Sequence, residues 1–127
     1  MSAPRQTPPR PTVLLVDDEA AFRDVLRLGL AKDFDIEEAA SANEAEMMMA
    51  TKHYDAVVCD HIMPDEEGLP FLIRARKTFP KTQRILLTGY INPELLSRST
   101  ELAGLAGCVM KPVNADDLAD AIRFALQ

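Results

Sequence analysis

The chain has 127 residues, of which 47% are apolar and 27% are charged, so it is expected to form one globular domain with its own core. Its net charge of −6 argues against direct contact with nucleic acid or with an anionic membrane surface. Its apolar runs are too short for a membrane span, and its N-terminus does not resemble a signal peptide. Its two cysteines fit no metal motif. These features predict a cytoplasmic protein whose thiols are reduced.

The chain alternates between short apolar runs typical of buried strands and stripes typical of amphipathic helices. Residues 1–11 hold four prolines and predict a disordered tail, or a Pro-rich ligand for a partner, ahead of a domain over 12–127. Ser41, Asn92 and Asn114 are expected to cap three helices. In chain order the expected elements are strand 12–16, helix 19–32, strand 34–37, helix 41–52, strand 56–60, helix 69–79, strand 84–88, helix 92–103, strand 108–110 and helix 114–125.

Strands that alternate with helices predict a parallel sheet with helices on both faces and right-handed crossovers. The strands over 12–16, 56–60 and 84–88 are apolar over most of their length and belong in the middle, whereas the strands over 34–37 and 108–110 suit the edges. This assignment predicts a flavodoxin-like, doubly wound α/β fold with five strands in the order 2-1-3-4-5 and five helices. Ligands of such sheets bind beyond the carboxyl ends of the strands, where the winding reverses, here between the first and third strands.

Polar side chains follow or end four of the predicted strands. Asp17 and Asp18 follow the first strand and Asp60 ends the third, while Thr88 ends the fourth and Lys111 follows the fifth. Carboxylates that converge repel one another unless a cation neutralises them, and Mg²⁺ is the usual ion for such a set. Together these residues are suited to the transfer of a phosphoryl group to or from Asp60. Taken singly, each also has an ordinary interpretation as a helix cap or a loop residue.

Four segments together resemble a response-regulator receiver domain of two-component signal transduction. They are Val16-Asp17-Asp18-Glu19, Asp60-His61-Ile62-Met63-Pro64 with Gly68, Leu87-Thr88-Gly89, and Lys111-Pro112. The resemblance covers residues 12–126. It implies that Asp60 accepts a phosphoryl group from a sensor histidine kinase or a phosphotransfer protein, and that the domain is a switch rather than an enzyme.

The resemblance also implies roles for the residues around Asp60. The implied ligands of Mg²⁺ are Asp17, Asp18, Asp60 and the backbone carbonyl of Ile62. Lys111 would pair with one phosphoryl oxygen, and Thr88 would donate to another and draw the following loop with it. The bond between Lys111 and Pro112 is expected to be cis. The surface over 92–127 would contact an output partner or a second copy, and the candidate contacts are Leu95, Leu96 and Arg98.

Some positions depart from the family pattern. Cys108 stands where receivers commonly carry an aromatic side chain that relays the phosphorylation state, and Tyr90 is either a substitute for that ring or an ordinary loop tyrosine. Bulky side chains at Ile62 and Tyr90 are expected to screen Asp60 from water and to prolong the phosphorylated state. The run Met47-Met48-Met49 must place at least one side chain in the core, and otherwise suits an adaptable partner surface.

Two other functions remain open from the sequence. A Mg²⁺-dependent phosphatase of the haloacid-dehalogenase type also uses an Asp nucleophile, but it normally carries a second acid where this chain has Ile62, and it needs a cap domain. An interaction module that is never phosphorylated would not need Asp60, Thr88 and Lys111 together.

Overall fold

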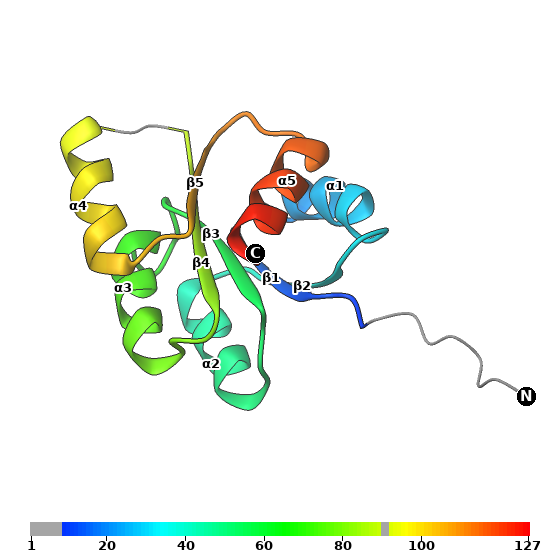
Figure 1. Ribbon diagram of the computed structural model, residues 1–127, viewed down its shortest axis with the longest axis horizontal. Helices are drawn as coiled ribbons and strands as arrows, with labels where there is room; N and C mark the ends of the chain where they lie inside the picture. Colours follow the sequence, from blue (N-terminus) through cyan, green and yellow to red (C-terminus); the bar gives the residue numbers. More distant parts are fainter. Residues whose placement is uncertain (1–8, 90–91) are drawn as a thin grey trace, which may run out of the picture.

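Strands and helices alternate along residues 9–89 and 92–127, the part of the chain that the computed structural model describes (Figure 1). All of the expected elements are present, and their ends differ from the predicted ends by two residues at most. In chain order they are β1 (Thr12–Val16), α1 (Ala20–Leu30), β2 (Asp35–Ala39), α2 (Ala42–Thr51), β3 (Ala56–Asp60), α3 (Gly68–Thr78), β4 (Gln83–Thr88), α4 (Pro93–Ala103), β5 (Gly107–Met110) and α5 (Ala115–Ala125).

The strands form one parallel sheet in the order β2-β1-β3-β4-β5, which confirms the predicted flavodoxin-like winding. The strands expected in the middle, β1, β3 and β4, are almost entirely buried, because helices cover both of their faces. Strand β3 lies between β1 and β4 in a register that sets Val16 opposite Cys59 and Asp60 opposite Leu87. The carboxyl ends of these three strands therefore meet at one edge of the sheet.

Helices bury both faces of the sheet (Figure 1). Helices α2 and α3 pack on one face, where Phe71 and Leu72 are fully buried. Helices α1 and α5 pack on the other face, where Leu26, Leu118 and Ile122 are buried. Burial of each such side chain stabilises the fold by about 1.5 to 3 kcal/mol relative to leaving it exposed. The two cores fix the sheet between the helix layers and leave its carboxyl edge for the site.

The predicted helix caps are confirmed by hydrogen bonds at three helix starts. The side-chain oxygens of Ser41, Asn92 and Asn114 accept from backbone amides two or three residues ahead, at 3.1, 2.8 and 2.8 Å. In α2 the side chain of Glu44 does not return a bond to the amide of Ser41, as it would in a capping box. It accepts instead from the amide of Ala40, at 3.5 Å. The helix start is therefore held mainly by the bond to Ser41.

The second strand begins and ends later than predicted. The amide of Phe34 still donates to Leu30, at 3.0 Å, so this buried residue closes the turn after α1 instead of opening the strand. Pairing with β1 starts where Asp35 lies opposite Thr12 and continues to Ala39. Of the expected tail, residues 1–8 lie outside the described part, and the domain boundary stays a prediction.

Several smaller expectations about packing are confirmed. Met49 is buried under α2 while Met47 is 64% exposed, so one side chain of the methionine run does face the core. Cys59 is fully buried in the same core and forms no disulfide. The peptide bond between Lys111 and Pro112 is cis. Each helix within the described ranges is too short or too polar to cross a membrane.

A buried arginine at the start of β4 was not anticipated from its position in an apolar strand. The side chain of Arg84 donates to the carbonyls of Ala103 and Gly104, at 2.7 and 3.2 Å, and to that of Thr82 at 2.7 Å. It thus binds the carbonyl groups that the C-terminal end of α4 leaves unpaired. Among the described side chains of α4 only Ala103 is buried, so this end anchors the helix.

Candidate functional site

Two buried carboxylates and one exposed carboxylate meet at the carboxyl edge of the sheet. Asp17 is 3% exposed and Asp60 is 6% exposed, while Asp18 is exposed to solvent. One oxygen of each lies within 4.8 Å of the others. Hard oxygen ligands grouped in this way fit Mg²⁺. The structure thus brings together the acidic residues that the sequence predicted as a set.

Lys111 adds a positive charge to this group. Its Nζ atom lies 3.0 Å from Asp17 Oδ2 and 3.4 Å from Asp60 Oδ1. Its backbone amide donates to the carbonyl of Thr88 at 2.8 Å, which ties the loop after β5 to the end of β4. Thr88 itself is buried, at 3% exposure, at that same end. The predicted cation and hydroxyl therefore both lie at the edge where the acids converge.

The surroundings of Asp60 and Lys111 shift both of their pKa values. Burial raises the pKa of Asp60, and the charge of Asp17 raises it further, against the opposing charge of Lys111. Burial by itself would lower the pKa of Lys111, but its hydrogen bond to Asp17 and the charge of Asp60 outweigh burial, so the pKa is raised. Lys111 therefore keeps its charge, and Asp60 is a more basic carboxylate than an exposed aspartate.

The first turn of α1 holds Asp17 in place. Asp17 Oδ1 accepts from the amide of Glu19 at 2.9 Å, and Glu19, not Asp18, is the residue that precedes the helix. The helix-cap interpretation of Asp18 is therefore wrong. Arg23 donates to the backbone carbonyl of Asp17 and pairs with Glu38 at 3.0 Å. The sequence analysis did not identify Arg23. A cation near the N-terminus of a helix is disfavoured by the helix dipole, so its presence there suggests that it binds a group outside the helix.

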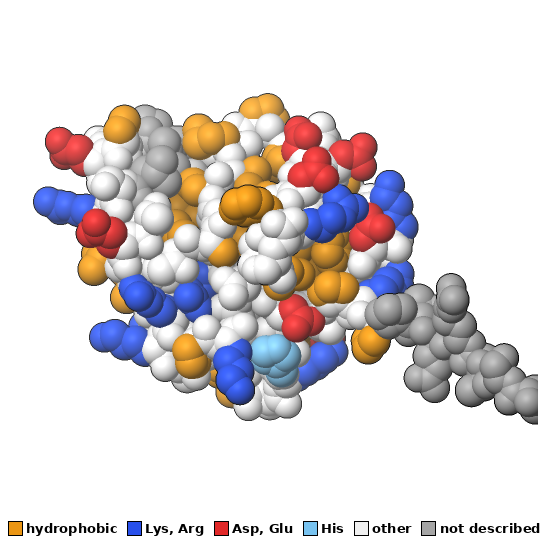
Figure 2. Space-filling model, in the orientation of Figure 1, with side chains coloured by type: hydrophobic (Ala, Val, Ile, Leu, Met, Phe, Trp, Pro, Cys, Tyr) orange, Lys and Arg blue, Asp and Glu red, His pale blue; other side chains and the backbone are white. Residues whose placement is uncertain are grey.

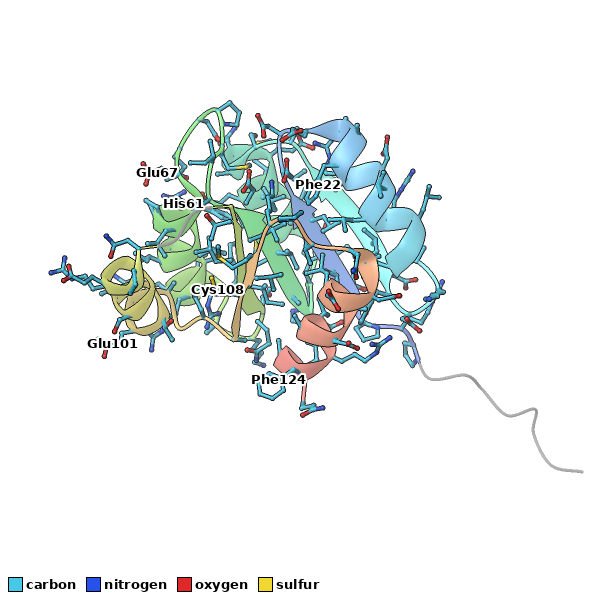
Figure 3. The ribbon with its side chains drawn as sticks, turned by 90° about the horizontal axis from the view of Figure 1, so that it is seen from above. Phe22, His61, Glu67, Glu101, Cys108 and Phe124 are labelled. Carbon is cyan, nitrogen blue, oxygen red and sulfur yellow. The ribbon has the colours of Figure 1, made fainter. Side chains whose placement is uncertain are left out.

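The loop after β3 is fixed by polar contacts to two helices. Asp65 accepts from the amides at the start of α2, with the shorter bond from Asn43 at 2.8 Å. Glu66 pairs with Arg74 of α3 at 2.8 Å. His61 Nε2 lies 3.4 Å from a carboxylate oxygen of Glu67. Both residues are labelled in Figure 3. The backbone that follows the phosphoacceptor candidate is thereby held from both ends.

Gly68, the first residue of α3, lies against the backbone of Asp60. A Cβ atom at Gly68 would be 2.2 Å from the carbonyl oxygen of Asp60, and the amide of Gly68 donates to the carbonyl of His61 at 2.8 Å. We expect Gly68→Ala to destabilise the protein by about 1 to 3 kcal/mol, because either the helix or the strand end must move. Urea unfolding measures this change.

A matched control for this substitution lies on β5. A Cβ atom at Gly107 would meet nothing closer than 3.8 Å, so Gly107→Ala is expected to change stability by less than about 0.5 kcal/mol. Equal stability losses in the two variants would contradict the close approach of Gly68 to Asp60.

The remaining predicted residues lie around this group. Ile62, whose carbonyl was expected to bind the metal, has a side chain that is 69% exposed. Cys108 is half-buried on β5 and packs against the core under α2 and α3 (Figure 3). Tyr90 lies outside the described residues, so the roles expected of it stay predictions. The side chains of Leu95 and Leu96 also lie outside the description, and Arg98 is exposed.

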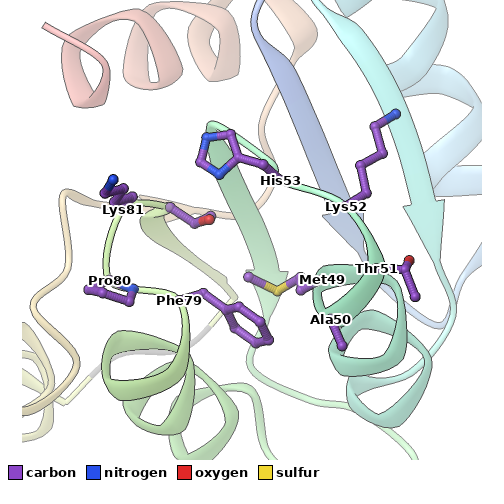
Figure 4. Close-up of a pocket in the computed structure, with 9 residues that line it drawn as sticks. Met49, Ala50, Thr51, Lys52, His53, Phe79, Pro80 and Lys81 are labelled. Atoms are coloured by element: carbon purple, nitrogen blue, oxygen red, sulfur yellow. The ribbon is translucent and has the colours of Figure 1, made fainter.

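A separate hollow of about 530 Å³ lies between the C-terminal ends of α2 and α3 (Figure 4). It is lined by Met49, Ala50, Thr51, Lys52, His53, Phe79, Pro80, Lys81 and Thr82. Figure 2 shows basic side chains and a histidine over this lower end of the molecule. These residues precede β3 and β4, so the hollow opens at the edge opposite to Asp60, and it contains no carboxylate. It does not contribute to the acidic site.

The comparisons with known proteins all indicate the same protein family. The family model of the response regulator receiver domain matches residues 13–123. The "Hydrogenase transcriptional regulatory protein HoxA" of Bradyrhizobium diazoefficiens is 33% identical over 116 residues, which are 91% of this chain and 24% of that protein. The chain thus spans about a quarter of the length of this curated relative.

Solved structures agree with this match. A CheY-like response regulator receiver domain protein from Methanospirillum hungatei has a TM-score of 0.85 at 32% identity, covering 92% of this chain and 94% of the other. The signal receiver domain of an HD domain-containing protein from Pseudomonas fluorescens has a TM-score of 0.86 at 28% identity, covering 96% of this chain and 90% of the other. Fold and sequence therefore point to the same group of proteins.

Proposed function

Because this chain belongs to the response regulator receiver domain family, we propose that it accepts a phosphoryl group on Asp60 and acts as a switch in two-component signal transduction. The proposed donor is the phosphohistidine of a sensor histidine kinase or of a phosphotransfer protein. The observation that carries the proposal is the position of Lys111 Nζ, 3.0 Å from Asp17 and 3.4 Å from Asp60 at the carboxyl edge of the sheet. A charged lysine beside a buried, basic carboxylate is suited to phosphoryl transfer.

Mg²⁺ is the proposed cofactor of this site. Its protein ligands would be Asp17, Asp18 and Asp60, whose oxygens lie within 4.8 Å of one another, together with the backbone carbonyl of Ile62. When bound, the ion supplies positive charge that offsets the charge of the carboxylates and of the phosphoryl oxygens. Receivers generally bind this ion at such an acidic pocket, and the donor set of this chain fits it.

In the proposed reaction the main role of the chain is to position its side chains around the phosphoryl group. A carboxylate oxygen of Asp60 attacks phosphorus as the phosphorus–nitrogen bond to the donor histidine breaks, and the histidine leaves with the electron pair. Lys111 keeps its charge next to the oxygen atoms of the transferred group, and Thr88 at the end of β4 donates a hydrogen bond to one of them. Burial of Asp60 limits the access of water to the product.

The proposed output surface is formed by α4, β5 and α5. Each of these elements carries an exposed apolar side chain, namely Leu102 at 57%, Met110 at 48% and Phe124 at 71%. Such side chains suit contact with an output partner or with a second copy of the domain. The proposal also places the protein in the cytoplasm, in keeping with cysteines that form no disulfide.

Labelling with acetyl phosphate in the presence of Mg²⁺ tests the proposed function. Intact-mass measurement should show one added phosphoryl group per chain, peptide mapping should locate it on Asp60, and removal of Mg²⁺ with EDTA should prevent it. Continuous release of phosphate from a monoester such as p-nitrophenyl phosphate would instead favour a phosphatase. No labelling, and no binding of beryllofluoride, would favour an interaction module that is never phosphorylated.

The exposed side chain of Ile62 gives a prediction about the lifetime of the phosphorylated state. Ile62→Asn is expected to speed the loss of the phosphoryl group about 3-fold to 10-fold, because a polar side chain two residues after Asp60 can bind and orient water. Decay of phosphorylated protein, followed by mass, measures the rate. Val25→Asn is a matched control, because Val25 of α1 is 68% exposed and Ile62 is 69% exposed. Equal decay in wild type and Ile62→Asn would contradict the screening role.

A further inference from the structure

The ammonium group of Lys111 has an aromatic neighbour besides its two carboxylates. Its Nζ atom lies 4.4 Å from the centroid of the Phe22 ring, over the ring face. A cation within about 6 Å of a ring centroid is attracted by the negative face of the ring. The side chain of Lys111 is 22% exposed, so water screens this attraction only in part. The ammonium is therefore held between Asp17, Asp60 and the ring.

The fold holds the Phe22 ring in this position. Phe22 is partly buried in the first turns of α1 and packs on the core under α1 and α5, and Figure 3 shows it beside the strand ends. The next residue, Arg23, binds the backbone of Asp17. Farther along, α1 approaches α5 so closely that a Cβ at Gly29 would be 2.3 Å from the Cβ of Ala115. Packing on this core therefore places the ring against Lys111.

We propose that Phe22 is a positioning residue that keeps the Lys111 ammonium aimed at the oxygens of Asp60, an inference that rests on the proposed function of the site. A lysine has a long stem with many rotamers, and fixing it costs conformational entropy. A carboxylate in place of the ring would also hold the ammonium, but it would compete with the phosphoryl group for its protons. An aromatic face restrains the ammonium and leaves its N–H donors available.

Simple apolar packing is the competing explanation, and two comparisons separate it from positioning. Phe22→Leu removes the ring but stays apolar, whereas Phe22→Tyr keeps the ring. A positioning role predicts that Phe22→Leu weakens beryllofluoride binding in the presence of Mg²⁺ about 3-fold to 10-fold, while Phe22→Tyr stays within about 2-fold of wild type. Isothermal titration calorimetry measures both affinities. Equal losses in the two variants would overturn the proposal.

A double-mutant cycle with Lys111→Met tests whether Phe22 acts through the lysine. Unfolding equilibrium constants are measured in urea without Mg²⁺, so the cycle does not depend on ligand binding. The effect of Phe22→Leu is expected to be about 3-fold to 10-fold smaller in the Lys111→Met background than in wild type. The same effect in both backgrounds would overturn the proposal. Phe22→Met replaces Phe22→Leu if the latter fails to fold.

The two experiments also distinguish failure of this inference from failure of the proposed function. Wild-type protein that binds no beryllofluoride and takes no label would overturn phosphoryl transfer to Asp60, together with the positioning role that depends on it. Wild-type protein that binds beryllofluoride normally, with Phe22→Leu indistinguishable from it, would overturn only the role of Phe22.

Discussion

Asp60→Asn is expected to abolish labelling by acetyl phosphate and, at the same time, to stabilise the metal-free protein. Labelling is lost because the amide is not a nucleophile for phosphorus. Stability rises because burial raises the pKa of Asp60, so its charged form is less favourable in the folded chain than in the unfolded chain. The charge of Asp17 adds to this cost, and that of Lys111 offsets part of it. We therefore expect the free energy of unfolding of Asp60→Asn to exceed that of wild type at neutral pH.

Urea unfolding in EDTA at several pH values checks the sign of this effect. A carboxyl group whose pKa is raised on folding binds more protons in the folded state, so wild-type stability falls as the pH rises from the ordinary aspartate pKa to the raised one. The advantage of Asp60→Asn should therefore be largest at neutral pH and vanish in acid, where Asp60 is protonated.

The control for Asp60→Asn is an acid on the surface of α1. The side chain of Asp24 is 59% exposed, and Asp24→Asn should leave labelling unchanged and alter stability by less than about 0.5 kcal/mol. Persistent labelling of Asp60→Asn would contradict the phosphoacceptor role. A loss of stability at neutral pH would contradict the electrostatic account of the buried site.

Lys111→Met is expected to slow labelling of Asp60 about 100-fold, which is typical for removal of one preorganised charge or donor from a buried site. In the folded chain the ammonium lies 3.4 Å from Oδ1 of Asp60, the residue that would receive the phosphoryl group. It also donates to Asp17 at 3.0 Å, so it competes with a metal ion for that carboxylate. The same variant should therefore bind Mg²⁺ more tightly, about 3-fold to 10-fold.

Two measurements separate these effects. The labelling rate is compared at saturating Mg²⁺, so that a change of metal affinity does not contribute, and the affinity is measured by calorimetry without acetyl phosphate. Lys32→Met is the control, because the side chain of Lys32 is 68% exposed and pairs only loosely, at 3.8 Å, with Asp116. Equal labelling rates in Lys111→Met and wild type, or weaker Mg²⁺ binding in the variant, would contradict this account of the lysine.

The sequence by itself was sufficient for the order of the elements and for the place of the site. Runs such as Val13–Val16 and stripes such as those of α5 are local patterns, and helix caps depend on residues a few positions apart. Parallel strands bring their carboxyl ends to one edge, so residues that end or follow β1, β3, β4 and β5 must converge there. The acidic group and Lys111 could therefore be predicted without coordinates.

The tertiary structure decided which neighbours these residues have. Arg84 stands in a strand that the sequence places in the middle of the sheet, and only the end of α4 beside it explains how its charge is buried. In the sequence Gly68 has the features of an ordinary loop glycine, and only the structure shows that it lies against the backbone of Asp60. Phe22 and Lys111 are far apart in the chain, and only the packing of α1 against α5 and the strand ends brings the ring under the ammonium. Such contacts depend on long-range packing, which local periodicity does not encode, because one pattern fits many arrangements of neighbouring side chains.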